Sequence, residues 1–535
     1  MGTVFTNGNI YLERERFAQA MWVEEGTVRA VGTNEEVLAA APAGCRQQDL
    51  GGATVIPGFN DSHLHMRTLG MNLKVVGLQN VDTMQECIER GRRYIAEHQL
   101  PPGELLMGRG WNHDYFTDEP RMPTRHDLDK ISTEHPVYYI RTCGHAISVN
   151  TKMLEMAGIT SATPQPEGGR FDLGEDGEPN GLFHECGARV FADLLPQPNA
   201  ETYADDLRMA MEYAASMGVT TVQSNDMNEN NYNEIWEALR TLRERGQLLT
   251  RYYAQCTFTN TTSYGRFINE GFVRGTGDEL VQVGPLKMFV DGSLGARTAL
   301  LRGEYADDDS ARGIQTLTEE VFDSMVELAT ANNTTVVTHA IGDGAIEQVL
   351  NSYDRVIENG QNPNRHGVIH VQITDQPLLQ RFLDSDVLAM VQPIFIHYDM
   401  YIVGDRVGAE LASTSYAFGT LTRMGVHTSY GTDCPVEDLN PYDNVYTAVA
   451  RRDLKCRPAD GYFPEEAVDI YTAIDNYTVE SAYACYAEDR RGRLLPGFQA
   501  DFVVLDANIF TVPHNEILSI RPVATYMNGE AVYQR

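Results

Sequence analysis

The order of predicted strands and helices through the middle of this chain constrains the fold more than any other feature. Apolar segments of strand length alternate with amphipathic segments, as where the strand 334–339 precedes the helix 344–358. Repeated units of this kind predict parallel strands joined by crossover helices, closed as an α/β (β/α)8 TIM barrel. The eight strand candidates are 54–56, 218–223, 251–258, 286–290, 334–339, 366–371, 387–391 and 426–430.

An open, doubly wound parallel sheet is the alternative to a barrel for such a pattern. No glycine-rich GxGxxG segment follows the first strand candidate, which disfavours a dinucleotide-binding sheet. We therefore expect a barrel domain over residues 57–489.

The two ends of the chain have a different pattern, with short strands and turns in place of strand–helix units. Strand-like segments recur before residue 55 and again after residue 500, where Asn528-Gly529 is a tight-turn signal. The simplest arrangement is one composite β-sandwich domain built from residues 1–56 and 490–535.

An insert is expected after the first barrel strand. About 150 residues separate the first two strand candidates, far more than one crossover needs. The segment 70–205 is therefore predicted to be a subdomain of its own, with a helix at 83–98 and a loop rich in glycine and acidic residues at 168–181.

The charge balance excludes several classes of partner. The chain has 75 acidic and 42 basic residues, a net charge of −33, and only five lysines. An acidic surface of this kind favours a folded protein of a high-salt, halophilic cytoplasm, and an ordinary acidic protein is the alternative. Nucleic acid and anionic membranes are not expected partners, because neither attracts a negative surface.

Targeting features also favour a cytoplasmic enzyme with a small-molecule substrate. No stretch of 18 apolar residues occurs, and the first residues lack a basic region followed by an apolar block. The eight cysteines are scattered without a CxxC pair, which is typical of reduced thiols. The sequence leaves a homodimer open.

Residues of metal-ligand type stand at the ends of five of the eight strand candidates. Barrel enzymes collect their chemistry at the C-terminal ends of their strands. Imidazole nitrogen and carboxylate oxygen suit a divalent ion, zinc above all, and there are enough of them for one or two ions. In chain order these residues are His63 and His65, Lys287, His339, His370 and Asp433.

Each of these residues has another explanation when it is taken alone. A buried histidine is more often a hydrogen-bonded core residue than a ligand. Asp433 by itself fits a turn or a helix cap, and Lys287 by itself fits a salt bridge with Asp291. Their arrival together at successive strand ends predicts a metal centre instead.

Lys287 needs a reason to lie inside an apolar strand. A free lysine is cationic, a poor metal ligand and costly to bury. Carboxylation by CO2 would turn its amine into an anion with two oxygens, able to bridge two ions. We therefore expect either an N6-carboxylysine or an unmodified lysine at this position.

The order HxH, Lys, His, His, Asp resembles the amidohydrolase superfamily. Three segments resemble the branch that includes N-substituted formamide deformylase, and a fourth resembles the re-entry of that branch into its β-sandwich. The similarity covers essentially the whole chain. The segments are 57–65, 287 with 291–297, 338–343 and 496–505.

The resemblance implies a role for each residue of the predicted centre. It implies that His63 and His65 bind one ion, that His339 and His370 bind a second, and that a carboxylated Lys287 bridges them. Asp433 would contact a metal and the nucleophilic water, which makes it the catalytic residue. The implied activity is hydrolysis of a non-peptide carbon–nitrogen bond, of the amide or N-formyl type.

Two alternative functions stay open. One is a cyclic-amide hydrolase or a deaminase, because the same kind of site attacks rings. The other is a metal-binding or regulatory barrel protein without turnover.

Five further residues are candidates for substrate binding, each with a packing or surface role as the alternative. Arg297 lies in a glycine-flanked loop after the Lys287 strand, and its alternative role is a structural salt bridge. His397 follows the seventh strand. Trp111, Asp114 and His145 lie in the insert. The segment 141–150 around His145 resembles a pocket-facing segment of the family's insert, and Trp111 and Asp114 are expected to line the same pocket.

Overall fold

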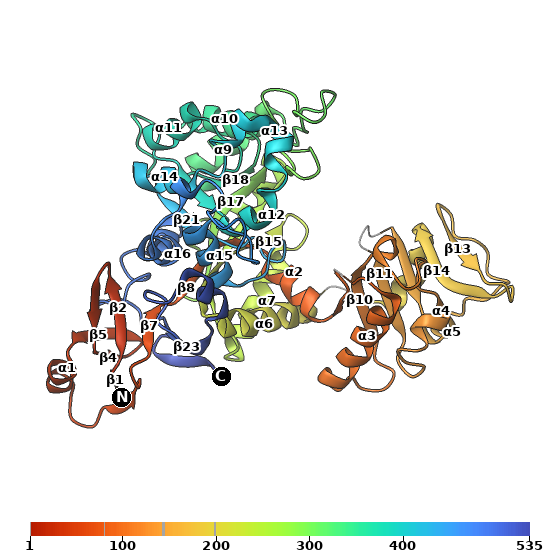
Figure 1. Cartoon of the computed structure of the whole chain (residues 1–535), viewed down its shortest axis with the longest axis horizontal. Helices are drawn as coiled ribbons and strands as arrows, with labels where there is room; N and C mark the ends of the chain where they lie inside the picture. Colours follow the sequence, from red (N-terminus) through yellow and green to blue (C-terminus); the bar gives the residue numbers. More distant parts are fainter. Residues whose placement is uncertain (1, 80, 142–144, 197–198) are drawn as a thin grey trace. The chain divides into compact units, whose positions relative to one another are not determined.

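The computed structural model describes residues 2–79, 81–141, 145–196 and 199–535. The chain forms two compact units (Figure 1), one made of Met1–Met66 with Ala210–Arg535 and the other of Arg67–Met209. Of the helices in these ranges, none has the length and apolar character needed to cross a membrane. The seven described cysteines are free thiols, and Cys143 lies outside the described residues.

The larger unit contains the predicted barrel, which is confirmed. Eight strands form one sheet in chain order, and every neighbouring pair is parallel. The last strand returns to the first, where the amide of Asp433 donates to the carbonyl of His63 at 2.8 Å. The strands are β8 (Phe59–Leu64), β15 (Val219–Asn228), β16 (Arg251–Thr257), β17 (Val281–Phe289), β18 (Val336–Ala340), β19 (Gly367–His370), β20 (Leu388–Val391) and β21 (Thr428–Tyr430).

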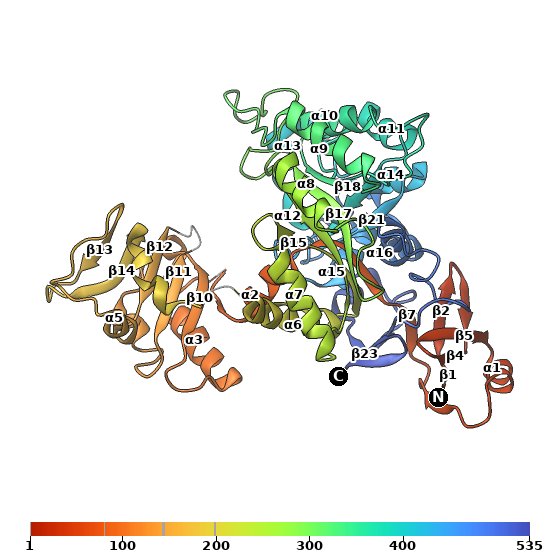
Figure 2. The same cartoon turned by 180° about the vertical axis from the view of Figure 1, so that it is seen from behind.

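Helices follow the strands and cover the outside of the sheet (Figures 1 and 2). Their buried residues recur at helical spacing, as Phe322, Met325, Val326 and Ala329 do in α9. One apolar stripe per helix therefore packs on the strands. The helices are α7 (Tyr232–Glu244), α8 (Thr261–Asn269), α9 (Glu319–Ala331), α10 (Asp343–Tyr353), α11 (Gln376–Asp384), α14 (Phe418–Met424), α15 (Pro441–Ala450) and α16 (Ile470–Ala484).

The prediction that residues 54–56 form the first barrel strand is wrong. Residues Thr54–Pro57 form β7, which pairs with terminal strands and not with the barrel. The change of sheet occurs at Gly58, whose amide donates to Asp501, while the amide of Phe59 donates to Gly218. A side chain on Gly58 would lie 2.2 Å from the Thr220 hydroxyl oxygen, so only glycine allows this crossing. Both strands are buried, so apolar pattern alone could not separate them.

The two ends of the chain form two further sheets with a common core. Phe5 packs edge-on against Phe502 with ring centroids 5.1 Å apart, and Phe502 stacks on Tyr526 at 4.4 Å. One sheet has the order β5-β4-β1-β6 and the other β24-β23-β22-β7-β2-β3. The additional strands are β1 (Thr3–Thr6), β2 (Asn9–Glu13), β3 (Arg16–Ala18), β4 (Ala20–Glu24), β5 (Thr27–Gly32), β6 (Arg46–Asp49), β22 (Phe502–Leu505), β23 (Pro522–Met527) and β24 (Glu530–Gln534).

A buried ion pair links the barrel to the C-terminal strands. Arg251, at the start of β16, donates from Nε to Oδ2 of Asp501 at 2.7 Å and from Nη2 to Oδ1 at 3.0 Å. Both residues are buried. Burial by itself would raise the pKa of Asp501, but the Arg251 guanidinium holds it below its ordinary value.

We expect Arg251→Met to lower the free energy of unfolding by about 3–5 kcal/mol, because it leaves a buried carboxylate without its partner. Urea unfolding followed by circular dichroism measures the change. Arg240→Met is the matched control, since the described partners of Arg240 are exposed glutamates on α7. Equal unfolding midpoints for the two variants would contradict the expectation.

The unit Arg67–Met209 has its own sheet and core. Its six strands have the order β13-β14-β12-β11-β10-β9, and helix α3 (Met84–His98) supplies Met84, Cys87 and Ile88 to the core. The strands are β9 (Val76–Gly77), β10 (Leu106–Trp111), β11 (Val137–Arg141), β12 (Ala146–Val149), β13 (Gly169–Leu173) and β14 (Pro179–Glu185).

Candidate metal centre

Three predicted ligands converge where the barrel closes. His63 is on β8, His65 follows it, and Asp433 follows the neighbouring β21. Their ligand atoms all lie within 4.8 Å of one another. Oδ1 of Asp433 is 3.3 Å from Nε2 of each histidine. Such separations are close to the edge of a tetrahedron around zinc with bonds of ~2 Å.

The carboxylate of Asp433 has the features of a ligand whose partner is an ion. Its Oδ1 atom is buried and has no hydrogen-bond partner in the described part of the chain. Asp433 also has a φ of +56°, in the left-handed region that residues other than glycine rarely adopt. A buried, unpaired carboxylate oxygen is costly, and a cation between it and the two imidazoles would satisfy it. The residues present therefore fit a divalent metal.

Lys287 lies beside this cluster, with Nζ 3.4 Å from Nε2 of His63. The side chain comes from β17 and is fully buried. Burial lowers the pKa of its amine to about 7, so a large fraction of the amine is neutral at physiological pH. Asp291 is not its partner, because that carboxylate accepts the backbone amides of Leu300, Ile341 and Gly342.

His339 and His370 form the other side of the cluster. Their ring centroids are 4.5 Å apart, and the ring of His370 is 5.9 Å from that of His63. Burial lowers the pKa of His63 and of His370 well below its ordinary value, which keeps both rings neutral, as metal ligation requires. All six residues predicted for the centre thus lie together in the structure.

Each of the four histidines has one ring nitrogen bound to an oxygen of the protein. This leaves the other nitrogen, Nε2 in three of them and Nδ1 in His339, open for an ion. The contacts are His63 Nδ1 to Gln255 Oε1 at 2.6 Å, His65 Nδ1 to the Asn225 carbonyl at 3.0 Å, His370 Nδ1 to Gln392 Oε1 at 2.7 Å, and His339 Nε2 to the Gly292 carbonyl at 3.0 Å.

Gln255 and Gln392 were not predicted from the sequence. Gln255 lies within β16, and Gln392 directly follows β20. The signal that could have identified them is a long polar side chain in or beside an apolar strand, as with Lys287. What they contact depends on strand register, which sequence spacing does not give.

We expect Gln392→Leu and Gln255→Leu each to weaken zinc binding by about 10–100-fold, because the imidazole loses the acceptor that orients it. Competition with a chromogenic chelator measures the affinity, and circular dichroism checks the fold. Gln380→Leu, on the exposed face of α11, is the matched control. Wild-type affinity in both buried variants would remove the orienting role.

The predicted substrate residues of the barrel unit have protein partners. Arg297 forms an ion pair with Asp307, with Nη2 2.8 Å from Oδ2. Nε2 of His397 lies 3.2 Å from both carboxylate oxygens of Glu437. The Arg297 contact is the salt bridge that the sequence left as the alternative.

The predicted substrate residues of the insert are described within their own unit. Trp111 is fully buried in the hydrophobic core of that unit, where its contacts are those of a packing residue. Asp114 lies 2.8 Å from a guanidinium nitrogen of Arg141. Nδ1 of His145 lies 2.9 Å from the carboxylate of Glu185.

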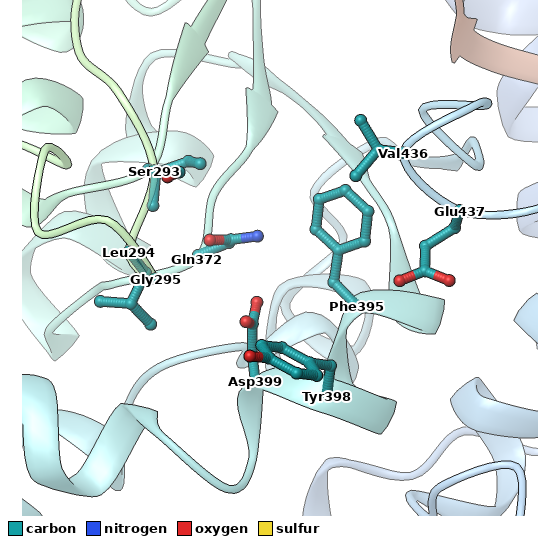
Figure 3. A pocket seen from close by; sticks show the side chains of 10 residues that line it. Ser293, Leu294, Gly295, Gln372, Phe395, Tyr398, Asp399, Val436 and Glu437 are labelled. Carbon is teal, nitrogen blue, oxygen red and sulfur yellow. The ribbon is translucent and has the colours of Figure 1, made fainter. Parts of the chain in front are cut away.

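A cavity of about 210 Å³ lies at the C-terminal mouth of the barrel (Figure 3). Its walls come from the segments that follow β17, β18, β19, β20 and β21. Four of these strands, β17, β18, β19 and β21, also carry or lead to a predicted ligand. Phe395 joins the cavity to the centre, since its ring stacks on His370 with centroids 5.9 Å apart. The lining residues are Ser293, Leu294, Gly295, Ile341, Gln372, Phe395, Tyr398, Asp399, Val436 and Glu437.

Comparison with known proteins gives similarity along the whole chain. A family model described as "Amidohydrolase family" matches residues 46–533. The chain is 31% identical to YtcJ of Bacillus subtilis, over 100% of both proteins. It is 26% identical to N-substituted formamide deformylase of Arthrobacter pascens, over 98% of this chain and 96% of that protein.

A solved structure supports the same relationship. The crystal structure of an uncharacterized metal-dependent hydrolase from Pyrococcus furiosus superposes with a TM-score of 0.75 at 28% identity. The match covers 96% of this chain and 100% of that one. The insert and the terminal sheets are therefore within the matched length.

Proposed function

This chain belongs to the amidohydrolase family, and on that basis we propose that it hydrolyses a non-peptide carbon–nitrogen bond of the amide or N-formyl type. The observation that carries the proposal is the convergence of His63, His65 and Asp433, with ligand atoms within 4.8 Å of one another. The similarity to N-substituted formamide deformylase supports the N-formyl type of substrate.

We propose zinc as the ion, held by His63, His65 and Asp433, with His339 and His370 as ligands for a second ion. Nitrogen and carboxylate ligands of this kind suit zinc better than magnesium or calcium. When bound, such an ion lowers the pKa of its water to ~7 and polarises a carbonyl group.

Lys287 is proposed to become a bridging ligand by carboxylation. Its neutral amine adds to the carbon of CO2. A nitrogen–carbon bond forms, the electron pair of one carbon–oxygen π bond moves to oxygen, and one proton leaves the nitrogen for solvent. The product is an anion with two oxygens in a site otherwise rich in neutral imidazoles. The lowered pKa of the amine favours the reaction, because only the unprotonated form has a free electron pair.

Asp433 is proposed as the group that moves the proton. Its Oδ1 atom accepts the proton of the attacking water and then delivers it to the leaving nitrogen. His63 and His370 are not proposed as proton acceptors. In each of them one ring nitrogen is bound to a glutamine, and the other ring nitrogen faces the metal cluster. Phe395 and the other cavity walls hold the substrate and exclude water on the open side of the centre.

Metal analysis followed by a substrate panel tests the proposal. We expect one or two zinc ions per chain, loss of activity with a chelator, and hydrolysis of formamides and simple amides. Activity on hydantoins or aminopurines alone would instead identify a cyclic-amide hydrolase or a deaminase. Bound metal with no hydrolysis of any class would favour a non-catalytic barrel.

A further inference from the structure

The cavity at the mouth of the barrel has a marked charge asymmetry. Two carboxylates, Asp399 and Glu437, line it, and its described lining includes no lysine or arginine. The remaining wall is largely apolar, with Phe395 next to the metal centre. A bound molecule therefore meets an aromatic ring, aliphatic groups and negative charge.

Gln372 is the second observation that points to a ligand here. The residue is only 2% exposed, yet its side-chain amide has no hydrogen-bond partner among the described residues. Figure 3 shows this amide directed into the cavity. Because this amide opens on the cavity, it is available to hydrogen-bond an occupant. Gln372 follows the ligand His370 by two residues, so that occupant would lie close to the reacting bond.

Asp399, from the segment that follows β20, presents an available acceptor to the cavity. Its Oδ2 atom accepts from the hydroxyl of Tyr416 at 2.7 Å, while Oδ1 has no hydrogen-bond partner in the described ranges. Burial raises the pKa of Asp399 to about 6, so the group is still mostly charged at pH 7.5. Glu437, by contrast, has the imidazole of His397 3.2 Å away. The uncompensated charge of the cavity therefore belongs mainly to Asp399.

Resting on the function proposed above, we infer that this cavity selects the substituent of the substrate. The geometry points to an apolar ring or chain that carries a hydrogen-bond-donating or positively charged nitrogen, recognised by Gln372 and Asp399. Substituents with a carboxylate are rejected. The size is suitable, because an apolar cavity of ~150 Å³ holds a benzene ring, and this one has room for a ring with a small substituent.

Three probes of matched shape test the inference on the wild-type protein. They are N-benzylformamide and its 4-aminomethyl and 4-carboxy derivatives, whose only substituent is on nitrogen and must occupy the cavity. We expect kcat/KM for the aminomethyl probe to exceed that for the carboxy probe by at least about tenfold, with the neutral probe between them. Equal rates, or a preference for the carboxy probe, would overturn the inference while leaving the hydrolase proposal intact.

Variants then assign the preference to residues. Asp399→Asn is expected to bring the aminomethyl and carboxy probes to within about threefold of each other, because the charge is removed while the shape remains. Gln372→Leu is expected to raise KM for the aminomethyl probe more than for the neutral probe, which has no group to bond to this amide. Asp489→Asn is the matched control, because Asp489 is an exposed aspartate in the loop that follows α16. This variant should keep the wild-type ratio of kcat/KM between the aminomethyl and carboxy probes. An unchanged ratio in Asp399→Asn would show that this carboxylate is not the selector.

A binding measurement separates this inference from the proposed reaction. Calorimetric titration of the three probes into the zinc-loaded protein needs no turnover. If none of the probes is hydrolysed but the aminomethyl probe still binds most tightly, the reaction proposal fails and the cavity inference stands. If the carboxy probe binds as tightly as the others, or none binds, the cavity inference fails.

Discussion

Asp433→Asn is expected to lower kcat by on the order of 10²–10⁴-fold while zinc remains bound, because an amide cannot accept and return the proton of the attacking water. The amide oxygen keeps a ligand atom near Nε2 of His63 and His65, each 3.3 Å from Oδ1 in the wild-type protein. The substitution is therefore expected to slow the chemical step more than it changes the fold or the zinc content.

The measurement combines metal analysis of the purified variant with its kcat on the best substrate of the panel. Asp489→Asn, the exposed aspartate used above, is the control for the same chemical change elsewhere. A variant that contains zinc and turns over at nearly the wild-type rate would remove Asp433 from proton transfer. Loss of zinc together with activity would instead assign it a purely structural part in the centre.

His63→Ala is expected to abolish both zinc binding at the first site and hydrolysis. The imidazole is buried, contacts Asp433 and Lys287, and receives its orientation from Gln255, so no neighbouring side chain can replace it. Because ions that bind only the folded state stabilise it by mass action, the variant should also lose the rise in melting temperature that zinc gives the wild type.

Zinc content, hydrolysis and the melting temperature with and without added zinc check this expectation. His98→Ala is the matched control, because His98 is an exposed residue of the insert that stacks on Tyr94. After chelation, added zinc should restore the activity of His98→Ala and not that of His63→Ala. A zinc-dependent rise in melting temperature as large in His63→Ala as in the wild type would mean that His63 does not hold the ion.

Much of the fold was predictable because the residue pattern of a single segment often agrees with the helix or strand that the segment forms. The helix predicted over 83–98 spans Met84–His98 in the structure, with Thr83 as its cap. The predicted resemblance to the amidohydrolase superfamily is confirmed by the family match. Parallel strands with crossovers bring their C-terminal ends to one face, so residues that end such strands are brought together by topology alone.

Other features could not be predicted from spacing. The apolar run from Val55 to Phe59 contains two strands of different sheets, and only the backbone partners of Gly58 and Phe59 separate them. Trp111 was a candidate for lining the pocket, and in the structure it is packed in the core of the insert. Hydrophobic periodicity could not have predicted either difference, because it indicates that a residue is buried and does not indicate which element packs against it.

The sequence by itself determined that the chain folds as a strand–helix barrel and which six residues meet at its mouth, because both follow from order along the chain and from the ends of parallel strands. Only the tertiary structure decided how those residues are used: which ring nitrogen of each histidine is free, that Gln255 and Gln392 orient two of them, and that Gln372 and Asp399 face a common cavity. These are contacts between segments far apart in the chain, and they depend on register and packing that local pattern does not specify.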